Sequence, residues 1–253
     1  MDLNLKDKKV LITGGSKGIG ESIGLEFARE GAHVVLVARN RDRLEEVAYS
    51  IKTATGATVE IDDTDLRSRS SAREISTKYS DIDIVVNNAG DIPRGSILDI
   101  DDDSWRSAWD LKVFGYISMC REFYRVMKER RSGVILNIIG MGGERPSADY
   151  ICGSSGNAAL MAFTRALGSS SSDHGIRVVG INPGPVRTDR LEYVLKHIAN
   201  KKSGNADDWQ QEYGNMPFGK PAEPYDIASA AVFLSSDKSA YTSGAILPIS
   251  GGR

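Results

Sequence analysis

Metal-binding and disulfide-forming side chains are scarce in this chain. Its 253 residues include two cysteines and three histidines. Cys120 and Cys152 lack the C-x-x-C spacing of metal and redox motifs, and His33, His174 and His197 are scattered along the sequence. We therefore expect no metal site, and two buried thiols in a reducing compartment.

An excess of one charge and a long apolar run are also missing. The 32 Lys and Arg residues nearly balance the 34 Asp and Glu residues, so no strong field attracts nucleic acid or an anionic membrane. No run reaches transmembrane length, and residues 1–8 lack the apolar stretch of a signal peptide. We expect a cytoplasmic protein without nucleic-acid or membrane partners. A uniform composition, 40% hydrophobic and 26% charged, predicts one domain over 1–253.

A glycine-rich turn stands near the start of the chain. The β-rich run 9–12 predicts a buried strand, and an amphipathic pattern from Gly18 predicts a helix that ends at Gly31. Between them, Gly14, Gly18 and Gly20 give the spacing G-x-x-x-G-x-G, which differs from the common G-x-G-x-x-G dinucleotide motif. Bare backbone at a helix N-terminus admits a pyrophosphate. The alternative is an ordinary strand-to-helix turn with spare glycines.

The next predicted strand, 33–38, ends in residues that favour NADP over NAD. In a dinucleotide-binding fold an acidic residue at this point binds the ribose 2′-hydroxyl, whereas arginine pairs with a 2′-phosphate. Here Ala38 and Arg39 stand at the strand end, and Lys17 adds a second cation from the glycine turn. The alternative is that both cations are only solvated surface charges.

Two further strands end in residues suited to a ligand. The strand 58–61 leads into acidic residues that include Asp65, which are either turn formers or neighbours of an adenine. The strand from Ile82 ends in Asn87-Asn88-Ala89-Gly90. Small residues at the carboxyl edge of a parallel strand leave room for a bound molecule.

Together, Thr13-Gly14-x-x-x-Gly18-Ile19-Gly20 and Asn87-Asn88-Ala89-Gly90 resemble the short-chain dehydrogenase/reductase family. The similarity continues through a strand at 133–138, a strand and loop at 175–188, a late helix from 224 and a last strand at 245–249. It implies a Rossmann-like α/β fold, with a doubly wound parallel seven-stranded sheet and helices on both faces. It also implies a nicotinamide cofactor and hydride transfer between the cofactor and a carbonyl or alcohol.

The resemblance also implies a set of cofactor-binding residues at the carboxyl edge of the sheet. With the cation proposed for the 2′-phosphate, they are Gly14, Ser16, Lys17, Gly18, Ile19, Gly20, Arg39, Asp65, Leu66, Asn88, Ala89, Gly90, Pro183, Gly184, Val186 and Thr188.

The family's catalytic residues are asparagine, serine, tyrosine and a lysine four residues after the tyrosine. Tyr150 matches the tyrosine, but Asp110, Gly140 and Ser154 stand at the positions that we match to the other three. Only about one ordinary tyrosine in a thousand is ionised at pH 7, which is a deficit of roughly 4 kcal/mol for base catalysis without a nearby cation.

Three functions remain open on this evidence. The first is an NADP-dependent oxidoreductase with a rearranged site, in which Tyr150 acts as acid/base and Ser147, Ser154 or Ser155 supplies a hydroxyl. The second is a protein that binds the dinucleotide without catalysis, as a sensor or partner subunit. The third is a non-redox enzyme on the same fold.

The segment at about 190–220 predicts a substrate lid. It is irregular and carries Trp209, Tyr213, Met216 and Phe218, which suggests a small-molecule substrate with an apolar or aromatic body. The alternative is packing against the domain's own surface. The family resemblance implies a homodimer or homotetramer, assembled through the helix after Tyr150 and the helix before it.

Overall fold

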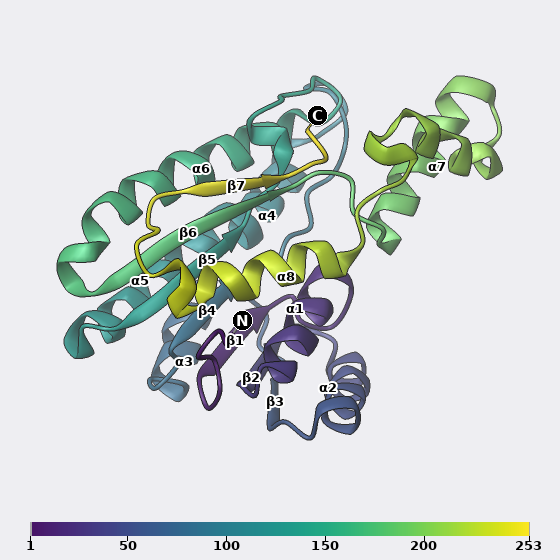
Figure 1. Cartoon of the computed structure of the whole chain (residues 1–253). Coiled ribbons are helices and arrows are strands. Elements are labelled where there is room, and N and C mark those ends of the chain that lie inside the picture. The colour runs from purple at the N-terminus through teal and green to yellow at the C-terminus, as the bar shows by residue number, and fades with distance from the viewer. Residues whose placement is uncertain (1, 253) are drawn as a thin grey trace.

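Seven parallel strands form one sheet in the computed structural model, which describes residues 2–252 (Figure 1). Their spatial order is β3-β2-β1-β4-β5-β6-β7. The strands are β1 Lys9–Thr13, β2 His33–Val37, β3 Val59–Asp62, β4 Ile84–Asn87, β5 Gly133–Ile138, β6 Ile176–Pro183 and β7 Ile246–Ile249. The chain runs outward from β1 to β3, returns to β4 and continues to β7, which confirms the predicted doubly wound sheet.

Helices cover both faces of the sheet. The α-helices are α1 Gly18–Arg29, α2 Arg41–Thr55, α3 Ser71–Lys78, α4 Asp102–Trp109, α5 Gly115–Arg130, α6 Ile151–Ser171, α7 Asp189–Ser203 and α8 Pro224–Ser235. On one face, a first core cluster that includes Ile23, Leu44 and Ile227 joins the sheet to α1, α2 and α8. On the other face, a second cluster that includes Ile75 and Phe123, with Leu167 packed against it, joins the sheet to α3, α5 and α6. No helix within residues 2–252 combines the length and the apolarity needed to cross a bilayer.

The continuous apolar runs of the strands follow from this layering. In β1, Val10 and Ile12 pack into the first cluster, whereas Leu11 between them packs into the second. Each of these side chains is fully buried, and such burial stabilises the fold by roughly 2 kcal/mol per residue. Because both faces are covered, the strands show no polar alternation.

The helix before β5 contains an irregularity that the sequence pattern does not reveal. Between α4 and α5, residues Asp110–Phe114 form a π-helix. π-helices are rare, appear mostly as single turns inside α-helices, and frequently lie at functional sites.

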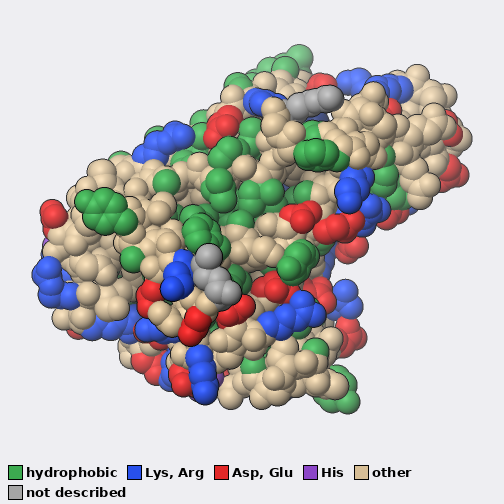
Figure 2. Space-filling view, in the orientation of Figure 1, with side chains coloured by type: hydrophobic (Ala, Val, Ile, Leu, Met, Phe, Trp, Pro, Cys, Tyr) green, Lys and Arg blue, Asp and Glu red, His purple; other side chains and the backbone are tan. Residues whose placement is uncertain are grey.

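The segment between β6 and α8 stands apart from the sheet. Figure 1 shows α7 and the short helices after it projecting to one side of the molecule. These short segments are the 3₁₀ helices Ala206–Asn215 and Pro217–Gly219. Trp209 and Tyr213 stack edge-to-face on each other, with ring centroids 5.6 Å apart. The space-filling view shows charges of both signs interspersed and hydrophobic side chains gathered in the middle of the drawn face (Figure 2).

Candidate active site

The glycine turn makes a cradle that only glycine allows. Gly14 and Gly18 have φ values of +67° and +60°. A Cβ on Gly20 would lie 2.2 Å from the carbonyl oxygen of Gly14. Helix α1 begins at this turn without a side-chain N-cap, so its first N–H groups are not occupied by a capping side chain and suit an anion.

The turn is fastened to the end of β4. The Asn88 amide donates to the carbonyl oxygens of Thr13 and Gly14, at 3.0 and 3.2 Å. In return, the Thr13 hydroxyl accepts from the backbone N–H groups of Asn88 and Ala89, at 2.9 and 3.1 Å. The Asn88 side chain is therefore committed to holding the turn, which brings the two predicted motifs together.

Beside the turn, the loop after β6 supplies the last group of predicted cofactor residues. The Gly184 N–H donates to Ile249 of β7 at 2.8 Å, and Val186 is buried. Thr188 accepts from the Leu191 N–H and caps α7. A Cβ on Gly18 would lie 3.1 Å from the Thr188 methyl group, so this loop, which follows Pro183, lies against the glycine turn.

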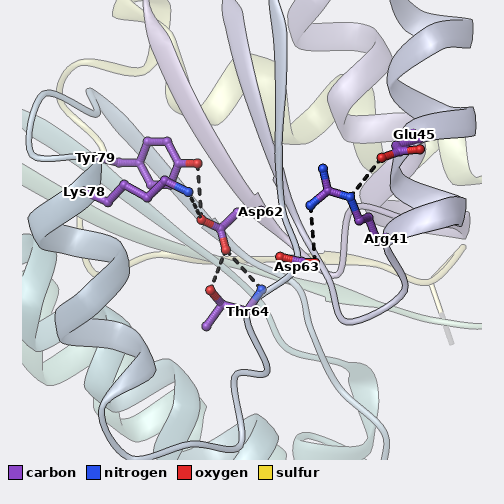
Figure 3. Close-up of polar contacts among 7 residues, drawn as sticks. All are labelled: Arg41, Glu45, Asp62, Asp63, Thr64, Lys78 and Tyr79. Atoms are coloured by element: carbon purple, nitrogen blue, oxygen red, sulfur yellow. Dashed lines mark hydrogen bonds and ion pairs between the residues drawn. The ribbon is translucent and has the colours of Figure 1, made fainter.

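Asp62, the last residue of β3, organises the loop that follows this strand (Figure 3). Its carboxylate accepts from Lys78 at 2.7 Å, from Tyr79 at 3.2 Å and from the Thr64 N–H at 3.0 Å. Burial tends to raise the pKa of Asp62, but the hydrogen bonds from Lys78 and Thr64 outweigh burial, and the pKa is lowered. This ordered turn presents Asp65, which is exposed, and Leu66, which is buried.

The cationic side chains that follow β1 and β2 differ in their ion-pair partners. Arg41 pairs with Glu45 and Asp63, at 2.9 and 3.5 Å (Figure 3). Lys17 is exposed and lies 3.8 Å from Asp189. Arg39 is exposed, and within residues 2–252 it has no ion pair. Of the other turn residues, Ser16 and Ile19 are half-buried.

Tyr150 stands at the head of α6, outside the helix proper. It is the N-cap residue, and its ring crosses over Gly153, where a Cβ would lie 2.0 Å from Cζ of the ring. The Arg94 guanidinium lies 5.4 Å from the centre of the Tyr150 ring. Because the ring occupies the space of a side chain at 153, its neighbour four residues on along the same helix face is Asn157 and not Ser154.

The serines considered as hydroxyl donors lie around the start of α6. The Ser154 hydroxyl accepts from the Ser147 N–H at 3.1 Å, and the Ser155 hydroxyl donates to the carbonyl of Ile151 at 2.7 Å. Ser147 and Ser155 are exposed. The Ser154 and Ser155 hydroxyls are therefore engaged with backbone groups around the start of α6.

Asp110 also differs from the sequence expectation. It is exposed at the start of the π-helix, and the side chain that enters the site is that of Lys112. The Lys112 amine donates to the carbonyl of Ile139 at 2.6 Å. Burial, together with the positive charge of Arg190, lowers the pKa of Lys112 to about 7.

Gly140 and Asn157 contact each other near Tyr150, in the part of the site that we call the corner. Gly140 has a φ of +136°, and a Cβ on it would lie 3.0 Å from Nδ2 of Asn157. This left-handed backbone favours glycine over serine at position 140. Asn157 is buried, and its Oδ1 accepts no hydrogen bond from any residue between 2 and 252.

The sequence pattern missed Lys112, Gly153 and Asn157. A lysine between the apolar residues Leu111 and Val113, and a glycine early in a long helix, were the available signals. Neither signal forms a motif of fixed spacing, because the position of Lys112 depends on the π-helix and that of Gly153 depends on where the Tyr150 ring lies.

Comparisons with known proteins agree with this architecture. Residues 8–199 match the family model described as short chain dehydrogenase. The chain is 32% identical over 258 residues to the 3-oxoacyl-[acyl-carrier-protein] reductase of Chlamydia muridarum, covering 100% of this chain and 99% of that protein.

Two solved structures have a similar fold. L-sorbose reductase of Gluconobacter frateurii, complexed with NADPH and L-sorbose, superposes with a TM-score of 0.90 and 31% identity, over 99% of this chain and 98% of that one. A 7α-hydroxysteroid dehydrogenase complexed with NADH gives a TM-score of 0.88 and 31% identity, over 99% and 96%. The protein described here belongs to the short-chain dehydrogenase/reductase family.

Proposed function

We propose that the protein is an NADP-dependent oxidoreductase that interconverts a carbonyl and an alcohol, with Tyr150 as the acid/base that exchanges a proton with the substrate oxygen. The observation that carries this proposal is that the Tyr150 hydroxyl is free of hydrogen bonds to the described residues. It lies on the same edge of the sheet as the glycine cradle, and no group within residues 2–252 forms a hydrogen bond with it. A phenol without a protein partner is available to a substrate oxygen.

The residues present fit a nicotinamide dinucleotide. The cradle at Gly14, Gly18 and Gly20 would hold the pyrophosphate, and the predicted residues after β3, β4 and β6 border the same edge. The unpartnered Oδ1 of Asn157 would accept from a hydroxyl of the cofactor or the substrate. When bound, the cofactor supplies or removes the hydride.

The choice of NADP over NAD rests on Arg39. Its guanidinium has no ion-pair partner among residues 2–252, and no acidic residue stands at the end of β2 to bind a ribose 2′-hydroxyl. We expect Arg39→Ala to raise the Kd for NADPH about tenfold and to leave the Kd for NADH unchanged. Arg43→Ala, in an arginine already paired with Glu46, is the matched control. Equal effects of Arg39→Ala on both cofactors would contradict the NADP assignment.

An apolar surface borders Tyr150 and supports a small substrate with an apolar or aromatic body. Tyr150 packs against a cluster that includes Ile92, Ile100, Trp105 and Trp109. The segment at about 190–220 serves as the lid over this surface. Phe218, which is 88% exposed, is its most available apolar side chain.

Assembly into a homodimer or homotetramer is part of the proposal. Ala158 and Ala159 are exposed on α6, and Leu247 on the edge strand β7 is 40% exposed. Light scattering coupled to gel filtration tests this assembly, and a monomer would contradict it.

The central test is NADPH oxidation by the wild type and Tyr150→Phe. The substrate panel contains a 3-oxoacyl thioester, a ketose and a keto-steroid, which are the carbonyl types named by the relatives. We expect turnover of at least one substrate by the wild type and a loss of about 100-fold or more in Tyr150→Phe. Equal rates would remove Tyr150 from the mechanism. NADPH binding without turnover would favour the sensor or partner-subunit function or non-redox chemistry.

A further inference from the structure

Lys112 enters the site because the helix around it is distorted. The π-helix Asp110–Phe114 turns the Asp110 carboxylate to the surface and directs the Lys112 side chain inward. Single π-helical turns inside α-helices are rare and frequently lie at functional sites.

The amine lies between the carboxyl ends of β4 and β5. Its stem runs along Gly90, where a Cβ would be 2.9 Å from Cδ of Lys112, and Nζ donates to the carbonyl of Ile139. Gly90 follows β4 and Ile139 follows β5, and these two strands are neighbours in the sheet. This is the edge where open α/β sheets bind their ligands.

No negative charge compensates the amine. The groups that face it are the Arg190 guanidinium from the start of α7 and the Tyr116 ring of α5, whose centre lies 5.8 Å from Nζ. Asp91, in the loop after β4, lies 3.9 Å from Arg190. Within residues 2–252 no carboxylate pairs with Lys112. A purely structural lysine in such a place would be costly, because an enclosed ammonium needs a counter-charge.

The amine and the Tyr150 phenol border the same loop. The carbonyl that accepts from Lys112 belongs to Ile139, and three residues later Gly142 backs the Tyr150 ring, with a distance of 3.3 Å from its Cβ position to the ring carbons. Tyr116 also links them. Burial raises the pKa of Tyr116, and Tyr150 is among the neighbours that raise it further, while the Lys112 amine lies over the Tyr116 ring.

We propose that Lys112 is the proton reservoir and positive charge for Tyr150, in place of the lysine that α6 lacks. This inference rests on the proposed function for its chemistry. Lys112 acts through Tyr150 and does not itself reach the reacting carbon.

The proton balance of the step is simple. Each carbonyl reduced consumes one proton, which the Tyr150 phenol gives to the substrate oxygen. The phenolate left behind takes a proton from the Lys112 ammonium through intervening water, and the neutral amine is reprotonated from solvent. In alcohol oxidation the same transfers run in reverse.

The first test is the pH profile of kcat for carbonyl reduction. In the wild type, kcat falls as pH rises through about 7, because the amine loses the proton that it delivers. In Lys112→Met we expect a loss of about 100-fold at pH 6 and a flat profile. Lys112→Arg restores part of the rate without the fall near pH 7, because its charge is permanent. Lys128→Met, at an exposed lysine of α5, behaves as the wild type. A Lys112→Met profile with the wild-type midpoint overturns the proposal.

The second test needs neither substrate nor cofactor, so it still decides the proposal if the protein oxidises no NADPH. In protein labelled with ¹³C at lysine Cε, the resonance missing from Lys112→Met identifies Lys112. We expect its titration midpoint near pH 7, and a lower midpoint in Tyr150→Phe, because the substitution removes a polar neighbour from an enclosed site. An ordinary lysine midpoint, or a midpoint that Tyr150→Phe leaves in place, overturns the link between the amine and the phenol.

Discussion

The glycine turn and the corner around Tyr150 lie at the same edge of the sheet, but they follow the family pattern to different degrees. In the turn, backbone atoms make the site, and Gly14, Gly18 and Gly20 stand where the pattern requires them. In the corner, side chains line the candidate site, and the buried groups found there, Lys112 and Asn157, are ones that the motif match did not single out. A turn that needs bare backbone can be made only by glycine at fixed positions, whereas a charged or polar group can be brought to a site by side chains from several different elements.

The largest expected effect comes from filling the cradle. Gly20→Ala places a methyl group 2.2 Å from the Gly14 carbonyl oxygen, so the turn must open. We expect the Kd for NADPH to rise at least about 100-fold, measured by fluorescence titration. Gly214→Ala, at a glycine whose Cβ position has no neighbour within 4 Å, is the control. Wild-type affinity in Gly20→Ala would show that the cradle is not the nucleotide site.

A similar collision in the corner should leave nucleotide binding intact. In Gly153→Ala the new methyl group takes the space of the Tyr150 ring, because the Cβ position lies 2.0 Å from Cζ. We expect kcat to fall about 100-fold while the Kd for NADPH changes less than about threefold. Ser155→Ala, on the exposed side of the same helix, is the control. Parallel losses of kcat and affinity would erase the distinction between the two regions.

Lys112 should destabilise the fold in a pH-dependent way. Burial lowers its pKa to about 7, so between roughly pH 7 and 10 the unfolded chain binds a proton that the folded chain lacks, and wild-type stability rises with pH across this window. Lys112→Met removes this dependence. Its gain in the free energy of unfolding should be roughly 2 kcal/mol at pH 7 and below, and small near pH 10. Urea unfolding of Lys112→Met and Lys128→Met measures it. A gain that does not vary with pH would contradict the lowered pKa.

The smallest expected effect, on the free energy of unfolding, comes from Asp62, which orders the loop after β3. Asp62→Asn weakens the hydrogen bonds from Lys78 and Thr64 and should lower the free energy of unfolding by about 1 kcal/mol near pH 7. The pKa of Asp62 is lowered in the fold, so its contribution is present above pH 4 and disappears as the carboxylate is protonated at lower pH. Thermal unfolding near pH 7 and below pH 4 tests this contribution. Asp63→Asn, which changes an exposed partner of Arg41, is the control. An undiminished effect at acid pH would argue against a charged Asp62.

The sheet and the cradle could be predicted because their signals are local. Apolar runs gave the strands, and glycine spacing gave the turn between β1 and α1. The corner could not be predicted by counting residues. Matching the stretch to the family's asparagine singled out Asp110, which is exposed, and passed over Lys112 in the same π-helix, whose amine bonds the carbonyl of Ile139. The ring of Tyr150 lies over Gly153, so a count of four from Tyr150 reached Ser154 and missed Asn157.

The backbone at Gly140 limits which side chains this part of the site can accept. A single change to serine at this position would meet both a left-handed backbone and the amide of Asn157, 3.0 Å from the new Cβ. The effect of a side chain at position 140 should therefore depend on which side chain stands at position 157, because the two would share the same space. Substitutions at the two positions should be non-additive in stability.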